Sequence, residues 1–252
     1  MSTNKLGLEK QLTEFYRSNK DYFLNMEKGH DAQYYMPILN VLREHKVFLK
    51  GKKVLEVGSG TGAFLKILEK TFSDSFEAVG VDISPIGKKY HQKKKIKFIH
   101  IDAQKLSFKD KSFDLVFSID AIEHIMNPQK AIMEMYRVTK KNGLILIRTR
   151  NYRSPLTTFS LMSLVEMMRD FTKKRKDLSQ TSRLKPVFSS NGGDKDAVSA
   201  IFADELRLSA ENLQGELLVF KTWTKGGFWQ ILNKIPFISL LGSMSLVLFK
   251  KA

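Results

Sequence analysis

Three glycines at alternating positions join a run of strand-forming residues to an apolar stretch with helical spacing. The segment reads Val54-Leu55-Glu56-Val57-Gly58-Ser59-Gly60-Thr61-Gly62. A loop of this kind lets the backbone approach a ligand closely at the start of a helix. Positions 58, 60 and 63 also fit the dinucleotide pattern G-x-G-x-x-G/A, and Asp82 follows at the expected distance of ~20 residues. The segment therefore predicts an α/β fold with a nucleotide-type ligand, and the glycines alone do not select that ligand.

The carboxylate of Glu56 narrows the choice of ligand. It would lie near a dinucleotide's pyrophosphate and repel it, whereas it would attract a ligand that carries positive charge. S-adenosylmethionine is such a ligand, because it has a sulfonium and an ammonium group. The next two predicted strands also end in carboxylates, at Asp82 and Asp102. In an open parallel sheet these strand ends line the ligand crevice.

With this order of motifs, roughly residues 50 to 150 resemble the class I S-adenosylmethionine-dependent methyltransferases of type 11. The resemblance implies a Rossmann-like, seven-stranded, mostly parallel sheet with an antiparallel last strand and helices on both faces. It also implies that S-adenosylmethionine is the cofactor. By this resemblance the methionine end of the cofactor would be held by Glu56, Gly58, Ser59, Gly60 and Gly62. Asp82 and Ile83 would contact the ribose, and Asp102 and Ala103 the adenine. Ser118, at the end of the fourth strand, would be a further cofactor residue.

Four segments follow from the same pattern. We expect an N-terminal helical cap over residues 1–45, a cofactor-binding core over 46–150, an inserted helical lid over 151–200 and the completion of the same sheet over 201–252. Aromatic residues of the cap either shape the substrate site or pack as ordinary core. The lid has an apolar stretch followed by the basic residues 173–176, and it either contacts the acceptor or packs on the core as an added helix.

A cluster of acid–base residues follows the fourth strand, at Asp120, Glu123 and His124. Residues three or four apart share one face of a helix, so these side chains form a candidate catalytic cluster. The same oxygen and nitrogen atoms could hold a divalent ion, and magnesium is an alternative here. No histidine follows His124, which leaves a metal site of the RNA-end methyltransferase type incomplete. We expect no metal.

Composition limits the partners and the chemistry. The chain has no cysteine, which excludes disulfides and thiolate catalysis. The formal net charge is +16, and its lysines are either a solvated face or a surface for RNA or anionic lipid. The apolar run over residues 235–249 is shorter than the ~20 residues of a membrane span, so peripheral membrane contact stays open. The N-terminus lacks an apolar signal segment, and we expect a cytoplasmic location.

The leading interpretation is a methyltransferase for a small-molecule, lipid-like or saccharide-linked acceptor. Transfer to oxygen is favoured, with His124 or Asp120 as the base. Two alternatives stay open, an RNA methyltransferase and a non-catalytic cofactor-binding partner subunit. The sequence carries no signal for an oligomeric state.

Overall fold

The computed structural model describes residues 2–72, 75–94, 96–152, 178, 182–183, 196–223 and 242–252. Its helices are α1 (Ser2–Ser18), α2 (Lys20–Gly29), α3 (Ala32–Glu44), α4 (Ala63–Phe72), α5 (Gly87–Lys94), the 3-10 helix η1 (Ile122–His124), α6 (Pro128–Val138) and α8 (Ala203–Glu211). Its strands are β1 (Lys53–Val57), β2 (Glu77–Asp82), β3 (Lys97–His100), β4 (Phe113–Ile119), β5 (Thr139–Arg150), β6 (Ser182–Arg183), β7 (Ser199–Ala200), β8 (Gly215–Trp223) and β9 (Met244–Lys251).

Several helices begin where the sequence supplies a capping side chain. Asn19 accepts a hydrogen bond from the backbone N–H of Tyr22 and so starts α2. Asp31 does the same for α3, and Asn127 for α6, which has a proline at its first position. Each cap satisfies a backbone donor that the helix itself leaves unpaired. In the N-terminal region, α2 and α3 therefore have locally encoded starts.

Seven strands form one sheet in the order β3-β2-β1-β4-β5-β9-β8. The pairs among β1 to β5 are parallel, and β9 is antiparallel to both of its neighbours, β5 and β8. The predicted fold class, with its reversed last strand, is confirmed. The strand order turns back between β1 and β4, and this is where an open α/β sheet binds its ligands.

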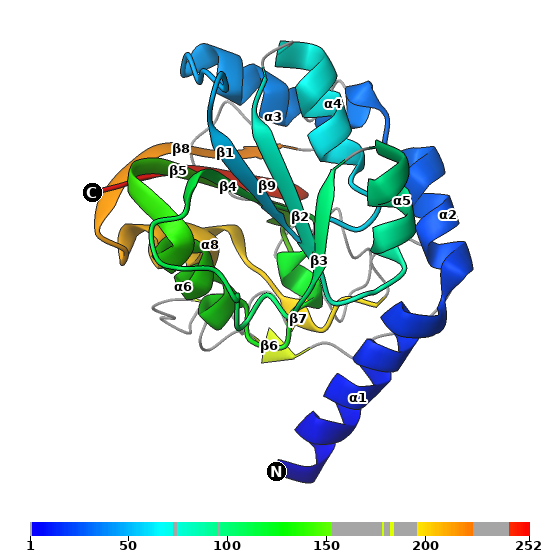
Figure 1. Ribbon diagram of the computed structural model, residues 1–252. Helices are drawn as coiled ribbons and strands as arrows, with labels where there is room; N and C mark the ends of the chain where they lie inside the picture. Colours follow the sequence, from blue (N-terminus) through cyan, green and yellow to red (C-terminus); the bar gives the residue numbers. More distant parts are fainter. Residues whose placement is uncertain are drawn as a thin grey trace.

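Helices cover both faces of the sheet (Figure 1). Successive side chains of a strand point to opposite faces, so Val54 packs in one apolar cluster and Leu55 in the other. The first cluster includes buried residues of α3 and α4, and the second includes residues of α6 and α8. The predicted helices on both faces are thus present, and α1 extends away from this body (Figure 1).

The predicted lid over residues 151–200 falls mostly outside the described residues. Within it the structure places Leu178, which is buried in the core, and a two-stranded antiparallel pair of β6 and β7. The basic residues 173–176 and the preceding apolar stretch lie outside the described residues. The helical lid therefore stays a prediction.

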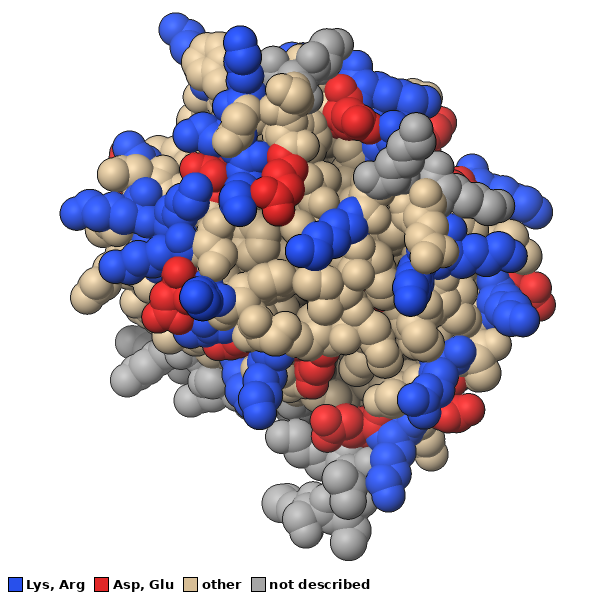
Figure 2. Space-filling model, in the orientation of Figure 1, with Lys and Arg blue, Asp and Glu red and all other residues tan. Residues whose placement is uncertain are grey.

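The basic side chains are dispersed over the face of the molecule that Figure 2 shows. Figure 2 shows Lys and Arg side chains spread around this face, with fewer Asp and Glu side chains among them. In the described part of the chain, several cations have an acidic neighbour, such as Lys53 beside Glu77 and Lys221 beside Glu44. Among the described helices, none combines the length and the hydropathy that crossing a bilayer requires.

Candidate active site

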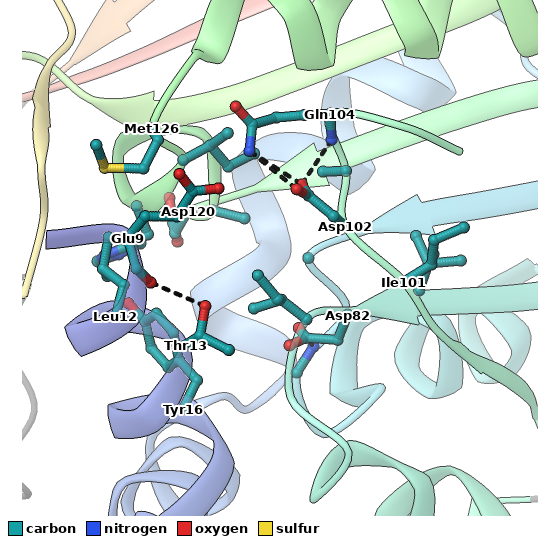
Figure 3. Close-up of a pocket in the computed structure, with 18 of the residues that line it drawn as sticks. Glu9, Leu12, Thr13, Tyr16, Asp82, Ile101, Asp102, Gln104, Asp120 and Met126 are labelled. Atoms are coloured by element: carbon teal, nitrogen blue, oxygen red, sulfur yellow. Dashed lines mark hydrogen bonds between the residues drawn. The ribbon is translucent and has the colours of Figure 1, made fainter. Parts of the chain in front are cut away.

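A cleft opens at the carboxyl ends of β1, β2 and β4, beneath helices α1 and α2 (Figure 3). It contains about 820 Å³ of empty space, part of which is open to solvent. Six predicted cofactor residues line it, namely Gly58, Gly60, Asp82, Ile83, Asp102 and Ala103. The lining does not include the other four, Glu56, Ser59, Gly62 and Ser118.

The glycine loop between β1 and α4 needs its glycines for conformation and for close packing. Gly58, Gly60 and Gly62 all have positive φ, between 48° and 74°, a region that costs other residues energy. A Cβ on Gly58 would come within 2.3 Å of the Cβ of Ala121, and one on Gly62 within 2.8 Å of His91 Nε2. The loop therefore tolerates no side chain at these two positions without rearrangement.

Glu56 is a buried carboxylate at the root of this loop. It is 4% exposed, and its Oε2 has no hydrogen-bond partner among the described residues. Burial raises the pKa of Glu56 well above its usual value, the nearby Asp82 raises it further, and Arg148 opposes both. Ser59 and Ser118 likewise have buried hydroxyl oxygens that lack a partner within the described part of the chain. Unpaired buried acceptors of this kind fit the ammonium and sulfonium groups of S-adenosylmethionine.

Asp82 and Asp102 end or follow β2 and β3 and face the cleft. Asp82 accepts hydrogen bonds from the backbone N–H groups of Gly60 and Ser84, both at 2.8 Å. Burial nevertheless raises the pKa of Asp82 above its usual value. Asp102 accepts from the backbone and the side-chain amide of Gln104 (Figure 3). Two carboxylates are thus oriented at the edge where a ribose and a base would lie.

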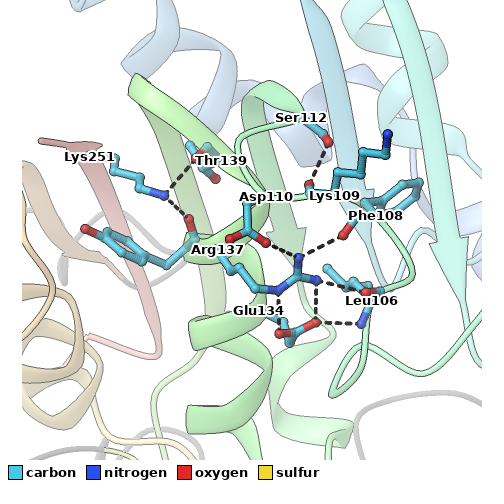
Figure 4. A network of polar contacts seen from close by, with 10 residues as sticks. Leu106, Phe108, Lys109, Asp110, Ser112, Glu134, Arg137, Thr139 and Lys251 are labelled. Carbon is cyan, nitrogen blue, oxygen red and sulfur yellow. Dashed lines mark hydrogen bonds and ion pairs between the residues drawn. The ribbon is translucent and has the colours of Figure 1, made fainter.

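The connection between β3 and β4, which carries Asp102, is held against α6 by Arg137, and Figure 4 shows the contacts of this arginine. Arg137 of α6 donates to both oxygens of Glu134, to the carbonyls of Leu106 and Phe108, and to Asp110. Glu134 in turn accepts the backbone N–H of Leu106 at 2.8 Å. This network fixes the connection between β3 and β4 against α6, and with it the position of Asp102.

Asp120 lies just after β4 and belongs to an ion pair. Arg148 donates to it from Nε at 3.1 Å and from Nη2, and the hydroxyl of Tyr34 donates to the same carboxylate. Burial alone would raise the pKa of Asp120, but the charge and hydrogen bonds of Arg148 hold it below its usual value. Arg148 is 2% exposed and also donates to the backbone carbonyl of Tyr34. The carboxylate therefore ties α3 to β5.

The helical spacing that was expected to unite Asp120, Glu123 and His124 does not apply. Asp120 precedes the short 3-10 helix η1 and has a φ of 50°, so the three side chains do not share one helical face. Glu123 is fully buried, and its Oε1 faces the backbone N–H of Arg150 at 3.4 Å. Asp120 and His124 line the cleft, and Glu123 is not part of the lining.

Sequence reasoning missed Arg148 and Asp196. Asp196 Oδ2 lies 3.4 Å from Nδ1 of His124 and accepts the hydroxyl of Tyr16 at 2.5 Å. An arginine inside the apolar run of β5 was a signal for a buried ion pair, because an uncompensated charge there would be costly. Asp196 carried no such signal, because its role depends on contacts across the fold.

No group of three or more His, Asp or Glu side chains in the described part of the chain could hold a metal ion. The magnesium alternative therefore finds no support at Asp120, Glu123 and His124.

Comparison with known proteins gives the same family. Residues 55–147 match the family model described as a methyltransferase domain. A demethylmenaquinone methyltransferase of Staphylococcus aureus is 34% identical over 141 residues, which cover 49% of this chain and 56% of that protein. A 2-methyl-6-phytyl-1,4-hydroquinone methyltransferase of Synechocystis is 37% identical over 115 residues, which cover 41% of this chain and 33% of that protein. The chain thus spans about half, or less, of the length of these curated relatives.

A solved structure from Thermotoga maritima, described as an S-adenosylmethionine-dependent methyltransferase and possible histamine N-methyltransferase, matches the fold. The TM-score is 0.57 at 18% identity, and the match covers 96% of this chain and all of that one. This likeness concerns the fold, whereas the domain match concerns the sequence that builds the glycine loop and the strand ends. Together they identify residues 55–147 as a methyltransferase domain, within a fold like that of a solved methyltransferase structure.

Proposed function

We propose that this chain transfers a methyl group from S-adenosylmethionine to an oxygen atom of a small, lipid-like acceptor. The observation that carries the cofactor assignment is the buried, unpartnered Oε2 of Glu56 beside the glycine loop. A cationic ligand would supply the charge that this carboxylate lacks, and a pyrophosphate would not. The bound cofactor supplies an electrophilic methyl group.

The residues of the chain would orient the two reactants and receive a proton. Asp82 and Asp102 would bind the ribose and the adenine, and the glycine loop would hold the methionine end. His124 lines the same cleft and would serve as the base for a hydroxyl acceptor. Asp120 is less suited to that role, because Arg148 keeps its pKa low and engages both of its oxygens.

The acceptor assignment is supported by the lining of the cleft and by the relatives. Besides the polar strand ends, the cleft is lined by apolar and aromatic side chains of α1, α2 and the segment after η1, among them Leu12, Tyr16, Phe23 and Met126. Two relatives have names that denote quinone-type acceptors. An apolar ring with a hydroxyl group would suit such a lining. A saccharide-linked acceptor would require more polar groups than this part of the cleft offers.

The first test is calorimetric binding of S-adenosylmethionine, S-adenosylhomocysteine and NADH to the full chain. We expect the first two to bind and Asp82→Ala to weaken them by roughly 10- to 100-fold, the worth of hydrogen bonds to a charged group. Glu77→Ala, which removes an exposed carboxylate at the start of β2, is the matched control. Binding of NADH alone would overturn the assignment of the cofactor. Transfer of a labelled methyl group to a soluble hydroquinone then tests the acceptor.

The net charge of +16 favours RNA as a second candidate acceptor. Its support is weaker, because the cations on the face seen in Figure 2 are dispersed, and some cations of the described chain, such as Lys53 and Lys221, pair with acidic residues. Labelling of total RNA in the same transfer assay, with binding that falls steeply as salt rises, would favour this acceptor over the hydroquinone. Cofactor binding without transfer to either probe would favour the partner-subunit alternative.

A further inference from the structure

Three side chains from distant parts of the sequence meet beside the cleft. Tyr16 comes from α1, His124 from η1 and Asp196 from the segment that leads into β7. One carboxylate oxygen, Oδ2 of Asp196, accepts the Tyr16 hydroxyl at 2.5 Å and lies 3.4 Å from Nδ1 of His124. The ring of Tyr16 also packs edge-on against the imidazole, with centroids 6.3 Å apart.

The segment that carries Asp196 is fastened directly to the turn that carries His124. The backbone N–H of Val198 donates to the carbonyl of Glu123 at 2.9 Å. The hydroxyl of Ser199 donates to the carbonyl of Ile125 at the same distance. Val198 is fully buried in an apolar cluster that also contains Tyr16. The segment that follows Asp196 is therefore fixed to the residues on either side of His124.

Because Asp196 is buried, its electrostatic interaction with the His124 imidazole is only weakly screened by solvent. The side chain of Asp196 is 3% exposed, and a buried carboxylate requires polar partners to offset its desolvation. A carboxylate beside Nδ1 holds the ring proton on that nitrogen and so defines Nε2 as the proton acceptor. At 3.4 Å the two atoms are at ion-pair distance and form no hydrogen bond with each other. Catalytic hydrogen bonds are commonly long or poorly aligned before the reactants bind.

We propose that Asp196 is a positioning residue that fixes the tautomer and orientation of His124, with Tyr16 as the second partner of its carboxylate. The inference rests on the proposed function for the role of His124 as base. As the acceptor oxygen forms its bond to the methyl carbon, its proton passes to Nε2 of His124. The electron pair of the broken carbon–sulfur bond stays on sulfur, leaving a neutral thioether. Asp196 then stabilises the imidazolium through Nδ1–H.

Other charged and titratable groups also face His124 from the elements around it. Asp82 of β2 interacts with it electrostatically, and Tyr16 lies against its ring. The pKa of Tyr16 is raised well above its usual value by burial, by Tyr22 and by Asp196, so its hydroxyl stays a neutral donor. Asp82 and Asp196 are therefore two carboxyl groups that neighbour the His124 imidazole. Asp196 is the one that lies beside Nδ1.

The test is a ¹³C and ¹⁵N NMR titration of histidine-labelled full-length protein, with His124 assigned by the loss of its signals in His124→Gln. In the wild type we expect the neutral His124 ring to carry its proton on Nδ1. In Asp196→Asn we expect the titration midpoint of His124 to fall by about one pH unit or more, since a neighbouring anion favours the charged ring. Asp196→Glu keeps the charge and should stay close to the wild type. Asp110→Asn removes a remote carboxylate and serves as the control.

Two results would overturn the inference. One is a neutral wild-type His124 ring that carries its proton on Nε2. This measurement does not depend on the folding of any variant. The other is an equal fall for the Asn and Glu variants, or none for Asn, in proteins whose near-UV spectra are native. None of these readouts needs cofactor or acceptor. A failure of the wild type to bind S-adenosylhomocysteine would contradict the proposed function and leave the titration result standing.

Discussion

Glu56 and Asp120 are two buried carboxylates at the same edge of the sheet, and their surroundings are opposite. Glu56, in β1, has an oxygen without a hydrogen-bond partner in the described part of the chain, and burial and Asp82 raise its pKa. Asp120, after β4, receives hydrogen bonds from Arg148 and Tyr34, and its pKa is lowered despite burial. We therefore call the side near β1 electrostatically incomplete, because its buried carboxylate has an oxygen without a partner in the described part of the chain. We call the side between β4 and β5 complete, because its carboxylate is paired with Arg148.

The difference shows how a buried charge can indicate either a ligand or a structural tie. A buried carboxylate without a cation costs free energy, and a protein retains such a group where a bound ligand compensates it. A carboxylate that an arginine already satisfies has little left to offer a cationic ligand. Glu56 is thus the group that the proposed cofactor would compensate, and Asp120 holds the neighbouring elements in place.

The largest effect is expected when the complete side is broken. Asp120→Asn leaves the guanidinium of Arg148 buried and without its anion, so we expect the free energy of unfolding to fall by about 3–5 kcal/mol. Denaturant unfolding at neutral pH measures this loss. Glu44→Gln, which removes the same charge from an exposed pair with Lys221, should have a far smaller effect. Equal losses in the two variants would show that Asp120 is no structural tie.

Glu56→Gln removes the charge on the incomplete side and should lower the affinity for the ligand without lowering the stability of the fold. We expect Glu56→Gln to unfold at a free energy no lower than that of the wild type, because an uncompensated charge is lost. Its affinity for S-adenosylmethionine should fall roughly 10- to 100-fold, the worth of a charged hydrogen bond. Calorimetry gives the affinity and denaturant unfolding gives the stability.

The matched control for this variant is Glu77→Gln, at the exposed start of the neighbouring strand β2. It should leave the affinity unchanged. A Glu56→Gln protein that binds the cofactor normally would remove Glu56 from the site and with it the main support for a cationic ligand.

Much of the fold could be predicted because local signals and the family pattern agree. The alternating glycines, the strand-forming runs before Asp82 and Asp102, and the apolar run of β9 all define elements through short-range properties of the chain. The reversed direction of β9 came from the family resemblance, since an isolated apolar run does not specify its direction.

The site could be predicted less completely, because its charges are balanced by residues remote in sequence. Asp120 meets Arg148 and Tyr34, which are 28 and 86 positions away. Asp196 meets Tyr16 across 180 positions. No periodicity reports such contacts. The helical spacing of Asp120, Glu123 and His124 gave a wrong grouping because η1 begins after Asp120 and contains a single turn.

The smallest effect, and the one that compares the two carboxylates most directly, is the pH dependence of stability. The folded pKa of Glu56 is raised, so the stability it contributes is full below its unfolded pKa of ~4.3 and is lost as pH rises through its folded value. The folded pKa of Asp120 is lowered, so its contribution is full above ~3.9 and is lost as pH falls.

Relative to the wild type, Glu56→Gln should therefore gain stability as pH rises from ~4.3, by at most about 1.4 kcal/mol per pH unit. The deficit of Asp120→Asn should shrink as pH falls below ~3.9. Urea unfolding across this range measures both slopes, and slopes of the same sign would mean that the two carboxylates do not differ in the way their surroundings indicate.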